Sequence, residues 1–194
     1  MRKPAANDHP IHELIRERWS PRVFGDQPVS ESDLASLLEA ARWAPSSMNE
    51  QPWRFVVATR AEPEAHQAIF DTLTEGTRKW AGAAPVLMIA TAHKTFARNG
   101  EPNRHARYDT GAAMAYLTLE ATSRGLVVHQ MGGFSAERAR AHLGIPEDFE
   151  PMAVVAVGHP TRVEALPPDL AEREKAGRAR KPQSEIAFRG SWRG

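Results

Sequence analysis

The chain has 194 residues and no cysteine, and its 25 Lys and Arg residues nearly balance its 24 Asp and Glu residues, for a formal net charge of +1. Near-neutrality argues against a global field that recruits nucleic acid or an anionic membrane, and the lack of cysteine excludes disulfides, thiolate metal sites and thiol nucleophiles. The length fits one domain with a substantial core. No apolar run approaches the ~20 residues of a membrane span, and the polar N-terminus has no hydrophobic signal region. We therefore expect a cytoplasmic protein without nucleic-acid or membrane partners.

A first helix is predicted from Pro10, which suits the first turn, to just before Pro21, which stops it. Its apolar positions fall on one face: Ile11, Leu14, Ile15 and Trp19. Arg18, Ser20 and Arg22 then cluster where helix gives way to extended chain. Guanidinium groups donate in a planar fork that matches phosphate oxygens. This cluster is therefore a candidate phosphate site, with a solvated arginine pair as the alternative.

A second helix is predicted to open with a capping box at Ser30 and to end near Trp43. The following stretch, residues 44–53, contains two prolines and two serines, which argue against regular structure. It carries hydroxyl and carboxamide groups on a short, stiff loop: Ser46, Ser47, Asn49 and Gln51. Such groups suit a flat heterocycle with donors and acceptors along its edge. An ordinary helix-to-strand turn with a buried Trp53 is the alternative.

Four short apolar runs predict strands, at 55–58, 85–90, 126–128 and 153–157. The runs are continuous rather than alternating, which indicates helices on both faces of the sheet. Helices are predicted at 63–76, 107–124 and 135–143, with Gly125 ending the second of these. That longest helix has small residues along one side: Gly111, Ala112, Ala113 and Ala115. We interpret it as the centre of a subunit interface, with a buried helix in a monomer as the alternative.

The third predicted strand leads into His129 and then into the adjacent glycines Gly132 and Gly133. Two glycines after a strand let the backbone approach a ligand closely. His129 is either a structural histidine or an active-site contact. The eight histidines are otherwise scattered, so no metal site is expected. The sequence has neither a dinucleotide-binding glycine motif nor a phosphate-binding loop motif, and no nucleophile elbow.

Six motifs, in this order, resemble the FMN-dependent nitroreductase family over roughly residues 11 to 190. They are Arg18-Trp19-Ser20-Pro21-Arg22, the P-S-S-x-N-x-Q-P-W stretch at 45–53, Gly125-Leu126 with Gly132-Gly133-Phe134, Leu143-Gly144-Ile145-Pro146, Val157-Gly158-His159-Pro160, and Arg178-x-Arg180-Lys181-Pro182. The resemblance implies an α+β fold: a three-layer α-β-α sandwich with a central, mostly antiparallel sheet. It also implies an interlocked homodimer that exchanges C-terminal segments.

The domain layout follows the same resemblance. Residues 1–10 would be a loose N-terminal tail, and residues 11–160 a single FMN-binding domain. Residues 161–194 would form an extension that wraps the partner subunit and returns to the FMN phosphate. That extension is too polar to pack on itself, yet it ends in Ile186, Phe188 and Trp192.

The resemblance further implies which residues bind FMN. The phosphate and ribityl chain would be held by the first and last segments, through Arg18, Trp19, Ser20, Arg22, Arg178 and Arg180. The loop would reach the flavin from the other subunit, through Pro45, Ser46, Ser47 and Asn49. The opposite side would be lined by Gln130, Met131, Gly132 and Gly133. Trp19 stands where relatives often have Arg or His, and Thr77 stands near a common Asn, so fewer polar contacts are expected from both.

The implied reaction is ping-pong hydride transfer from NADH or NADPH, through flavin N5, to an electron-poor acceptor such as a nitroaromatic or a quinone. Because a bound cofactor would perform the chemistry, no catalytic side chain is assigned. Gly132 and Gly133 are candidate contributors through a backbone N–H near N5. Another flavin reaction on the same scaffold (flavin fragmentation, reductive dehalogenation or ring oxidation) and a non-catalytic FMN-binding protein are the alternatives. A basic-tail interaction module is disfavoured by Glu172 and Glu174 within the charged run.

Overall fold

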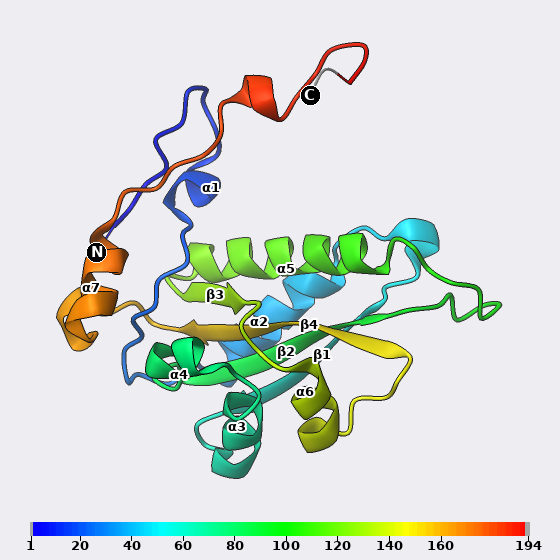
Figure 1. Ribbon diagram of the computed structural model, residues 1–194, viewed down its shortest axis with the longest axis horizontal. Coiled ribbons are helices and arrows are strands. Elements are labelled where there is room, and N and C mark those ends of the chain that lie inside the picture. Colours follow the sequence, from blue (N-terminus) through cyan, green and yellow to red (C-terminus); the bar gives the residue numbers. More distant parts are fainter. Residues whose placement is uncertain (1, 193–194) are drawn as a thin grey trace.

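The computed structural model describes residues 2–192 and is built on an antiparallel sheet of four strands in the order β1-β2-β4-β3 (Figure 1). The strands are β1 Trp53–Thr59, β2 Val86–His93, β3 Val127–Met131 and β4 Phe149–Gly158. Each neighbouring pair is antiparallel, and with the helices this confirms the α+β class. All four predicted strands exist, but each extends beyond its apolar run. The extension of β3 places His129, Gln130 and Met131 inside the strand rather than after it.

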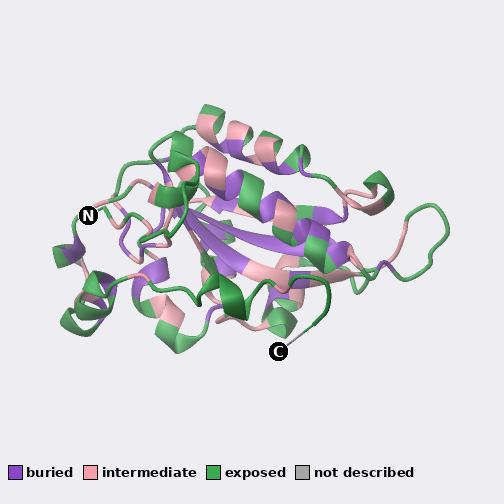
Figure 2. Cartoon of the chain, turned by 90° about the horizontal axis from the view of Figure 1, so that it is seen from above, coloured by how far each residue is buried: buried purple, intermediate pink, exposed green. Residues whose placement is uncertain are grey.

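Two layers of helices cover the sheet. The helices α2 Glu31–Arg42 and α5 Ala106–Ser123 pack on one face, and α3 Pro63–Phe70, α4 Glu75–Ala81 and α6 Ala136–Leu143 pack on the other. Along β2, Met88 faces the α2/α5 core while Leu87 and Ile89 face the opposite core. Figure 2 shows buried strands at the centre of the molecule and helices with exposed outer sides, and most of the buried strand residues belong to β2 and β4. The three-layer expectation is therefore confirmed.

Local capping explains the helices whose ends agree with prediction. The Ser30 hydroxyl accepts the Asp33 N–H at 3.0 Å and starts α2. The Ser135 hydroxyl accepts the Arg138 N–H at 3.1 Å and starts α6. Gly125 follows α5 with a φ of 72°, a left-handed conformation that glycine adopts without a steric cost.

Two helix predictions are wrong. The helix expected over 63–76 is two helices, because Thr72 and Leu73 between them are fully buried. The Thr72 hydroxyl donates to the Ile69 carbonyl at 2.7 Å, and such local bonds compete with helix continuation. The first helix is also shorter than expected: α1 covers only Glu13–Glu17. Within the described part of the chain, no residue of α1 is fully buried, and Ile15 is 49% exposed.

The two ends of the chain lie side by side. After β4 come the turn η2 Val163–Ala165, the helix α7 Pro168–Lys175 and the turn η3 Gln183–Glu185. Figure 1 shows this last segment running beside the N-terminal segment and past α1. The Arg178 guanidinium donates to the carbonyls of Lys3 (2.6 Å) and Arg16 (3.1 Å). The proposed wrapping of residues 161–194 around a partner subunit stays a prediction. Within residues 2–192, no helix is both long and apolar enough to cross a membrane.

Candidate functional site

The turn that follows β3 is packed on one side and open on the other. A Cβ atom on Gly133 would lie 2.9 Å from the Thr74 hydroxyl and 3.1 Å from the Thr77 hydroxyl, so this position requires glycine. The Gly133 carbonyl accepts the Thr77 hydroxyl at 2.7 Å and the Thr74 N–H at 2.9 Å. A Cβ atom on Gly132, in contrast, would meet nothing within 4 Å. A ligand can therefore reach the backbone at Gly132, while Gly133 anchors the turn.

A cavity of about 330 Å³ lies beside this turn. It collects six of the residues predicted from the sequence: Arg22, Thr77, Gln130, Met131, Gly132 and Gly133. The Thr77 hydroxyl proton is already donated to the Gly133 carbonyl, so the contribution of Thr77 is to hold the turn. Leu170 and Arg173 of α7 also line the cavity, and sequence reasoning missed both. They lie in the segment that looked too polar to pack.

His129 joins β3 to the segment that carries the first arginines. Its Nδ1 lies 2.8 Å from the Pro21 carbonyl oxygen, and its ring lies 4.5 Å from that of Trp80. Burial lowers the pKa of His129 to about 4, an effect opposed by the bond to Pro21 and reinforced by the charges of Arg22 and Arg18. The ring is thus neutral at pH 7. Because a carbonyl only accepts, Nδ1 carries the proton and Nε2 does not. This geometry favours the structural interpretation of His129, although the ring also lines the cavity.

Arg18, Arg178 and Arg180 form a cluster of like charges. Burial and the charges of Arg178 and Arg180 lower the pKa of Arg18, and burial and Arg180 lower the pKa of Arg178. The Arg18 guanidinium donates to the Ser20 hydroxyl at 3.2 Å. None of the ion pairs found within residues 2–192 includes any of these three arginines. An anion bound among them would relieve their repulsion and stabilise their charged forms.

Arg22 differs from this cluster because its charge is compensated within the chain. Its guanidinium lies 3.2 Å from one oxygen of Glu174, and its backbone N–H donates to the other at 2.7 Å. Glu174 is only 1% exposed. Trp19, between the two arginines in sequence, lies under the Lys3 ammonium, which is 4.8 Å from the centre of its ring. In the sequence, Glu174 lies within a charged run, and nothing there indicates this pairing.

The loop between α2 and β1 is held in an unusual backbone conformation. Met48, Asn49 and Gln51 have φ values of 55°, 55° and 51°. Each such non-glycine residue costs on the order of 1 kcal/mol or more, and such strain concentrates at functional sites. Ser47–Asn49 form a single 3-10 turn, so the expectation of no regular structure is wrong at these three residues. The loop is therefore fixed rather than free.

One buried carboxylate holds this loop. The Ser47 N–H donates to Asp109 Oδ2 at 3.0 Å, and Asp109 is 4% exposed. The Ser46 hydroxyl accepts the Gln51 N–H at 3.0 Å. Sequence reasoning missed Asp109, which lies in the first turn of α5 and is separated from the loop by about sixty residues. Pro45 and Asn49 are exposed, so the loop presents polar groups outward.

The loop and the arginines lie at opposite ends of α5. The loop contacts Asp109 near the start of the helix. Arg18 and Trp19 instead line a cavity of about 200 Å³ together with Thr122 and Gly125 at its end. Asp109 and Thr122 are 13 residues apart, or about 20 Å along a helix that rises roughly 1.5 Å per residue. In one chain, the two groups of predicted residues therefore do not meet.

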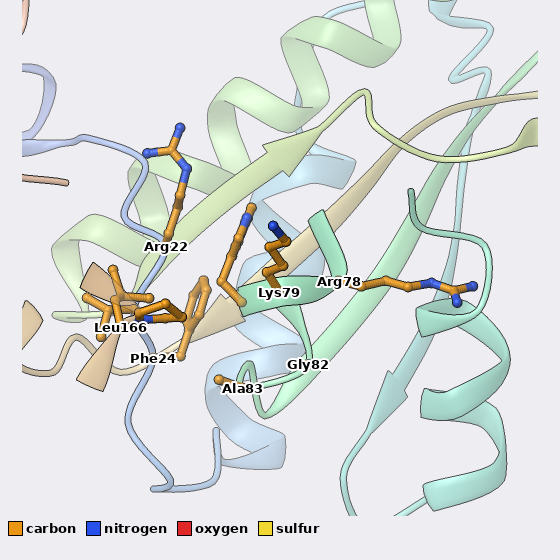
Figure 3. Close-up of a pocket in the computed structure, with 10 residues that line it drawn as sticks. Arg22, Phe24, Arg78, Lys79, Gly82, Ala83 and Leu166 are labelled. Carbon is orange, nitrogen blue, oxygen red and sulfur yellow. The ribbon is translucent and has the colours of Figure 1, made fainter. Parts of the chain in front are cut away.

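Figure 3 shows a second cavity, of about 260 Å³. The two share Arg22 and Trp80. In Figure 3, Phe24 and Leu166 lie together on one wall, and the Arg78 side chain points away from the cavity. Arg78 is held there by the Leu73 carbonyl, at 3.0 Å. The apolar side chains of Val23, Phe24 and Leu166 are part of its lining, and it brings in none of the predicted residues besides Arg22.

Comparisons with known proteins agree with this fold. A family model described as Nitroreductase family matches residues 15–159. An uncharacterised 15.4 kDa protein of Mycolicibacterium smegmatis is 38% identical over 148 residues, which cover 72% of this chain and 97% of that protein. A protein of Thermus thermophilus named NADH dehydrogenase is 31% identical over 176 residues, covering 74% of this chain and 83% of its own.

A solved structure gives a further comparison. A crystal structure described as an oxidoreductase containing FMN is 37% identical to this chain, with a TM-score of 0.91. The superposition covers 97% of this chain and 96% of the other. Among residues 2–192, no group of three or more His, Asp or Glu side chains is arranged to hold a metal ion.

Proposed function

The chain belongs to the nitroreductase family, and from this premise we propose that it is an FMN-dependent oxidoreductase. It would pass a hydride from NADH or NADPH to an electron-poor acceptor such as a nitroaromatic or a quinone. The single observation that carries the proposal is the open backbone of Gly132, which lies in the same cavity wall as Arg22. The similar crystal structure described as containing FMN supports the choice of cofactor.

The residues present fit the anionic end of FMN. A phosphate monoester carries between about −1.5 and −2 charges at pH 7. Arg18, Arg178 and Arg180 offer planar guanidinium donors. Burial, followed by repulsion from the other two arginines, lowers the pKa of Arg18, and the Ser20 hydroxyl lies beside Arg18. An anion of this charge would turn that repulsion into attraction. The cluster is thus better suited to a phosphate than to a neutral ligand.

The cavity beside β3 fits the ring end. Gly132 leaves open space where any side chain would project, and the Thr77 and Gly133 hydrogen bond keeps the neighbouring backbone rigid. The Gln130 side-chain amide donates a hydrogen bond to the Thr118 hydroxyl at 3.3 Å. Bound FMN would supply the hydride-accepting and hydride-donating chemistry. The chain's own residues would orient it and leave one face accessible.

A second copy of the chain would complete the site. The outward face of α5 is exposed and apolar, with Tyr108 79% and Tyr116 45% exposed and the small Gly111 and Ala115 between them. This exposed face supports the interpretation of α5 as part of a subunit interface over that of a buried helix in a monomer. If two copies pack through α5 in opposite directions, the Ser46–Asn49 loop of one approaches the arginine cluster of the other. This homodimer removes the roughly 20 Å separation that a single chain leaves.

No side chain in the cavity is suited to relay protons at neutral pH. His129 has a pKa of about 4, and its only proton is held by the Pro21 carbonyl. The nicotinamide donor and the acceptor would therefore occupy the same open space in turn. This predicts ping-pong kinetics, with parallel lines in double-reciprocal plots.

The visible spectrum of the pure protein tests the proposal. The protein should be yellow, or should become yellow when FMN is added. NADH or NADPH should bleach it under anaerobic conditions, and a quinone or nitroaromatic should restore the colour. A colourless protein that ignores added FMN overturns the proposal. A yellow protein that neither nicotinamide bleaches would instead be a non-catalytic FMN-binding protein.

A further inference from the structure

We infer that Glu174 is a positioning residue for the cofactor site, which it serves by fixing the guanidinium of Arg22 and cancelling its charge. The inference rests on the proposed function, because Arg22 matters only if its cavity holds FMN. Glu174 lies in α7, in a charged run that reads as a solvated surface. The structure places it instead in the interior, 1% exposed.

Glu174 makes contacts with two separate parts of the N-terminal segment. Its carboxylate accepts the backbone N–H of Arg22 at 2.7 Å and lies 3.2 Å from the Arg22 guanidinium. Its backbone carbonyl accepts the Lys3 ammonium at 2.7 Å. A buried carboxylate is tolerated only when it is paired and hydrogen-bonded. The pair with Arg22 meets that requirement, so neither group is free to turn elsewhere.

The bond to Glu174 orients the rest of the Arg22 guanidinium. A guanidinium carries several N–H donors in a rigid planar fork, and Glu174 engages Nη1. Arg22 lines the cavity that also contains Gly132 and Gly133, so its remaining donors stay at the cavity wall. Glu174 itself does not line that cavity; it acts through Arg22.

Charge cancellation separates Arg22 from the other arginines. Within residues 2–192, Arg18, Arg178 and Arg180 form no ion pair, although the charge of Glu17 acts on Arg178, whereas the Arg22–Glu174 pair is neutral overall. A positive charge near a flavin favours its reduced, anionic form over its oxidised form. Glu174 therefore keeps the reduction potential of bound FMN lower than Arg22 alone would set it. A residue that only anchored α7 would not have this effect.

The test compares FMN binding and reduction potential in matched variants. Glu174→Gln keeps the shape but removes the charge, and it should move the potential of bound FMN to more positive values. The reduced form should gain about tenfold in binding over the oxidised form, the effect of one uncompensated charge in a site of effective dielectric about 20. Replacing the whole pair, as Arg22→Met with Glu174→Leu, restores neutrality and should return the potential to the wild-type value.

Glu172→Gln is the control, because Glu172 lies on the same helix, is exposed, and pairs only with the exposed Lys175. It should change neither the affinity nor the potential. Thermal unfolding of each apoprotein shows whether it is folded, and the pair replacement keeps the test valid if Glu174→Gln alone does not fold. A wild-type apoprotein that binds no FMN refutes the proposed function and this inference together. If the wild type binds FMN but Glu174→Gln shifts the potential no more than Glu172→Gln does, or if the pair replacement moves the potential away from the wild-type value, this inference alone is overturned.

Discussion

The two ends of α5 carry two different kinds of surface. At its start, the Ser46–Gln51 loop is uncharged apart from Glu50, is held in left-handed backbone conformations and is fixed by one buried carboxylate, Asp109. At its end, the surface is built from charged side chains, with Arg18 from the N-terminal segment close to Arg178 and Arg180 from the C-terminal one. One surface is shaped by backbone geometry and the other by charge.

This difference indicates how a site with both properties can be assembled. The strained loop can be fixed by local contacts, so it needs only the loop and one turn of α5. The arginine cluster brings like charges together, which is unfavourable until an anion arrives. It is therefore set up by distant segments that the rest of the fold holds in place. A dimer that packs through α5 would bring the two surfaces together, and the variants below test this arrangement.

The largest effect is expected from breaking the proposed contact between copies. Ala115→Arg places a charge on the exposed face of α5, where burial in an interface would cost several kcal/mol. We expect a folded monomer that has lost FMN, although every arginine is still present. Analytical ultracentrifugation and FMN fluorescence titration measure the two properties. Glu64→Gln, on the opposite layer in α3, is the control. A monomeric variant with full FMN affinity would show that one chain suffices.

The next largest effect is expected at the charged end alone. Arg18→Ala combined with Arg180→Ala removes two charge-assisted hydrogen bonds, each worth roughly 1.5–3 kcal/mol, so FMN affinity should fall by about a hundredfold to ten-thousandfold. The FMN-free protein should be no less stable, because like charges have been removed. Isothermal titration and thermal unfolding of the apoprotein separate these effects. Lys79→Ala, an exposed cation on α4, serves as the control. Unchanged FMN affinity in the double variant would show that the cluster does not bind the phosphate.

A smaller effect is expected from pH, again at the charged end. The pKa of His129 is about 4 in the folded state against an ordinary value of 6.5. The unfolded chain therefore binds more protons between these values. Stability is full above about pH 6.5, falls as the pH drops toward 4, and levels off below it. The loss is at most about 3 kcal/mol.

The His129→Phe variant isolates this contribution. It keeps an aromatic ring against Trp80 but cannot titrate. Urea unfolding at pH 7.5 and pH 4.5 should show a steeper loss of stability in the wild type than in the variant. Equal losses would mean that His129 is not the group responsible.

The smallest effect is expected at the neutral end. Asp109→Leu removes the acceptor of the Ser47 N–H, which should lower the free energy of unfolding by about 1–3 kcal/mol and loosen the strained loop. FMN affinity should fall less than in the double arginine variant. Asp109→Asn retains an oxygen acceptor and should recover most of the loss. If Asp109→Leu instead weakens FMN binding as much as the arginine changes do, the loop and the arginine cluster do not differ in their contribution to FMN affinity.

The sequence by itself determined the parts of this protein that depend on near neighbours. Continuous apolar runs specified four strands covered on both faces, and Ser30, Ser135 and Gly125 specified helix ends, because capping and burial patterns are local. The arginine and glycine motifs pointed to the candidate site, because the chemistry of a short motif depends mainly on its own residues. The resemblance built on those motifs named the family that the comparisons then showed.

Only the tertiary structure decided which distant groups meet. Burial of Thr72 and Leu73 divided one predicted helix in two. The pairing of Glu174 with Arg22 joins residues about 150 positions apart, and Asp109 reaches a loop about 60 positions away. The separation of the loop from the arginines along α5 could likewise not be predicted from the sequence. Such contacts depend on the whole path of the chain, because a buried charge is stable only where the fold delivers its partner.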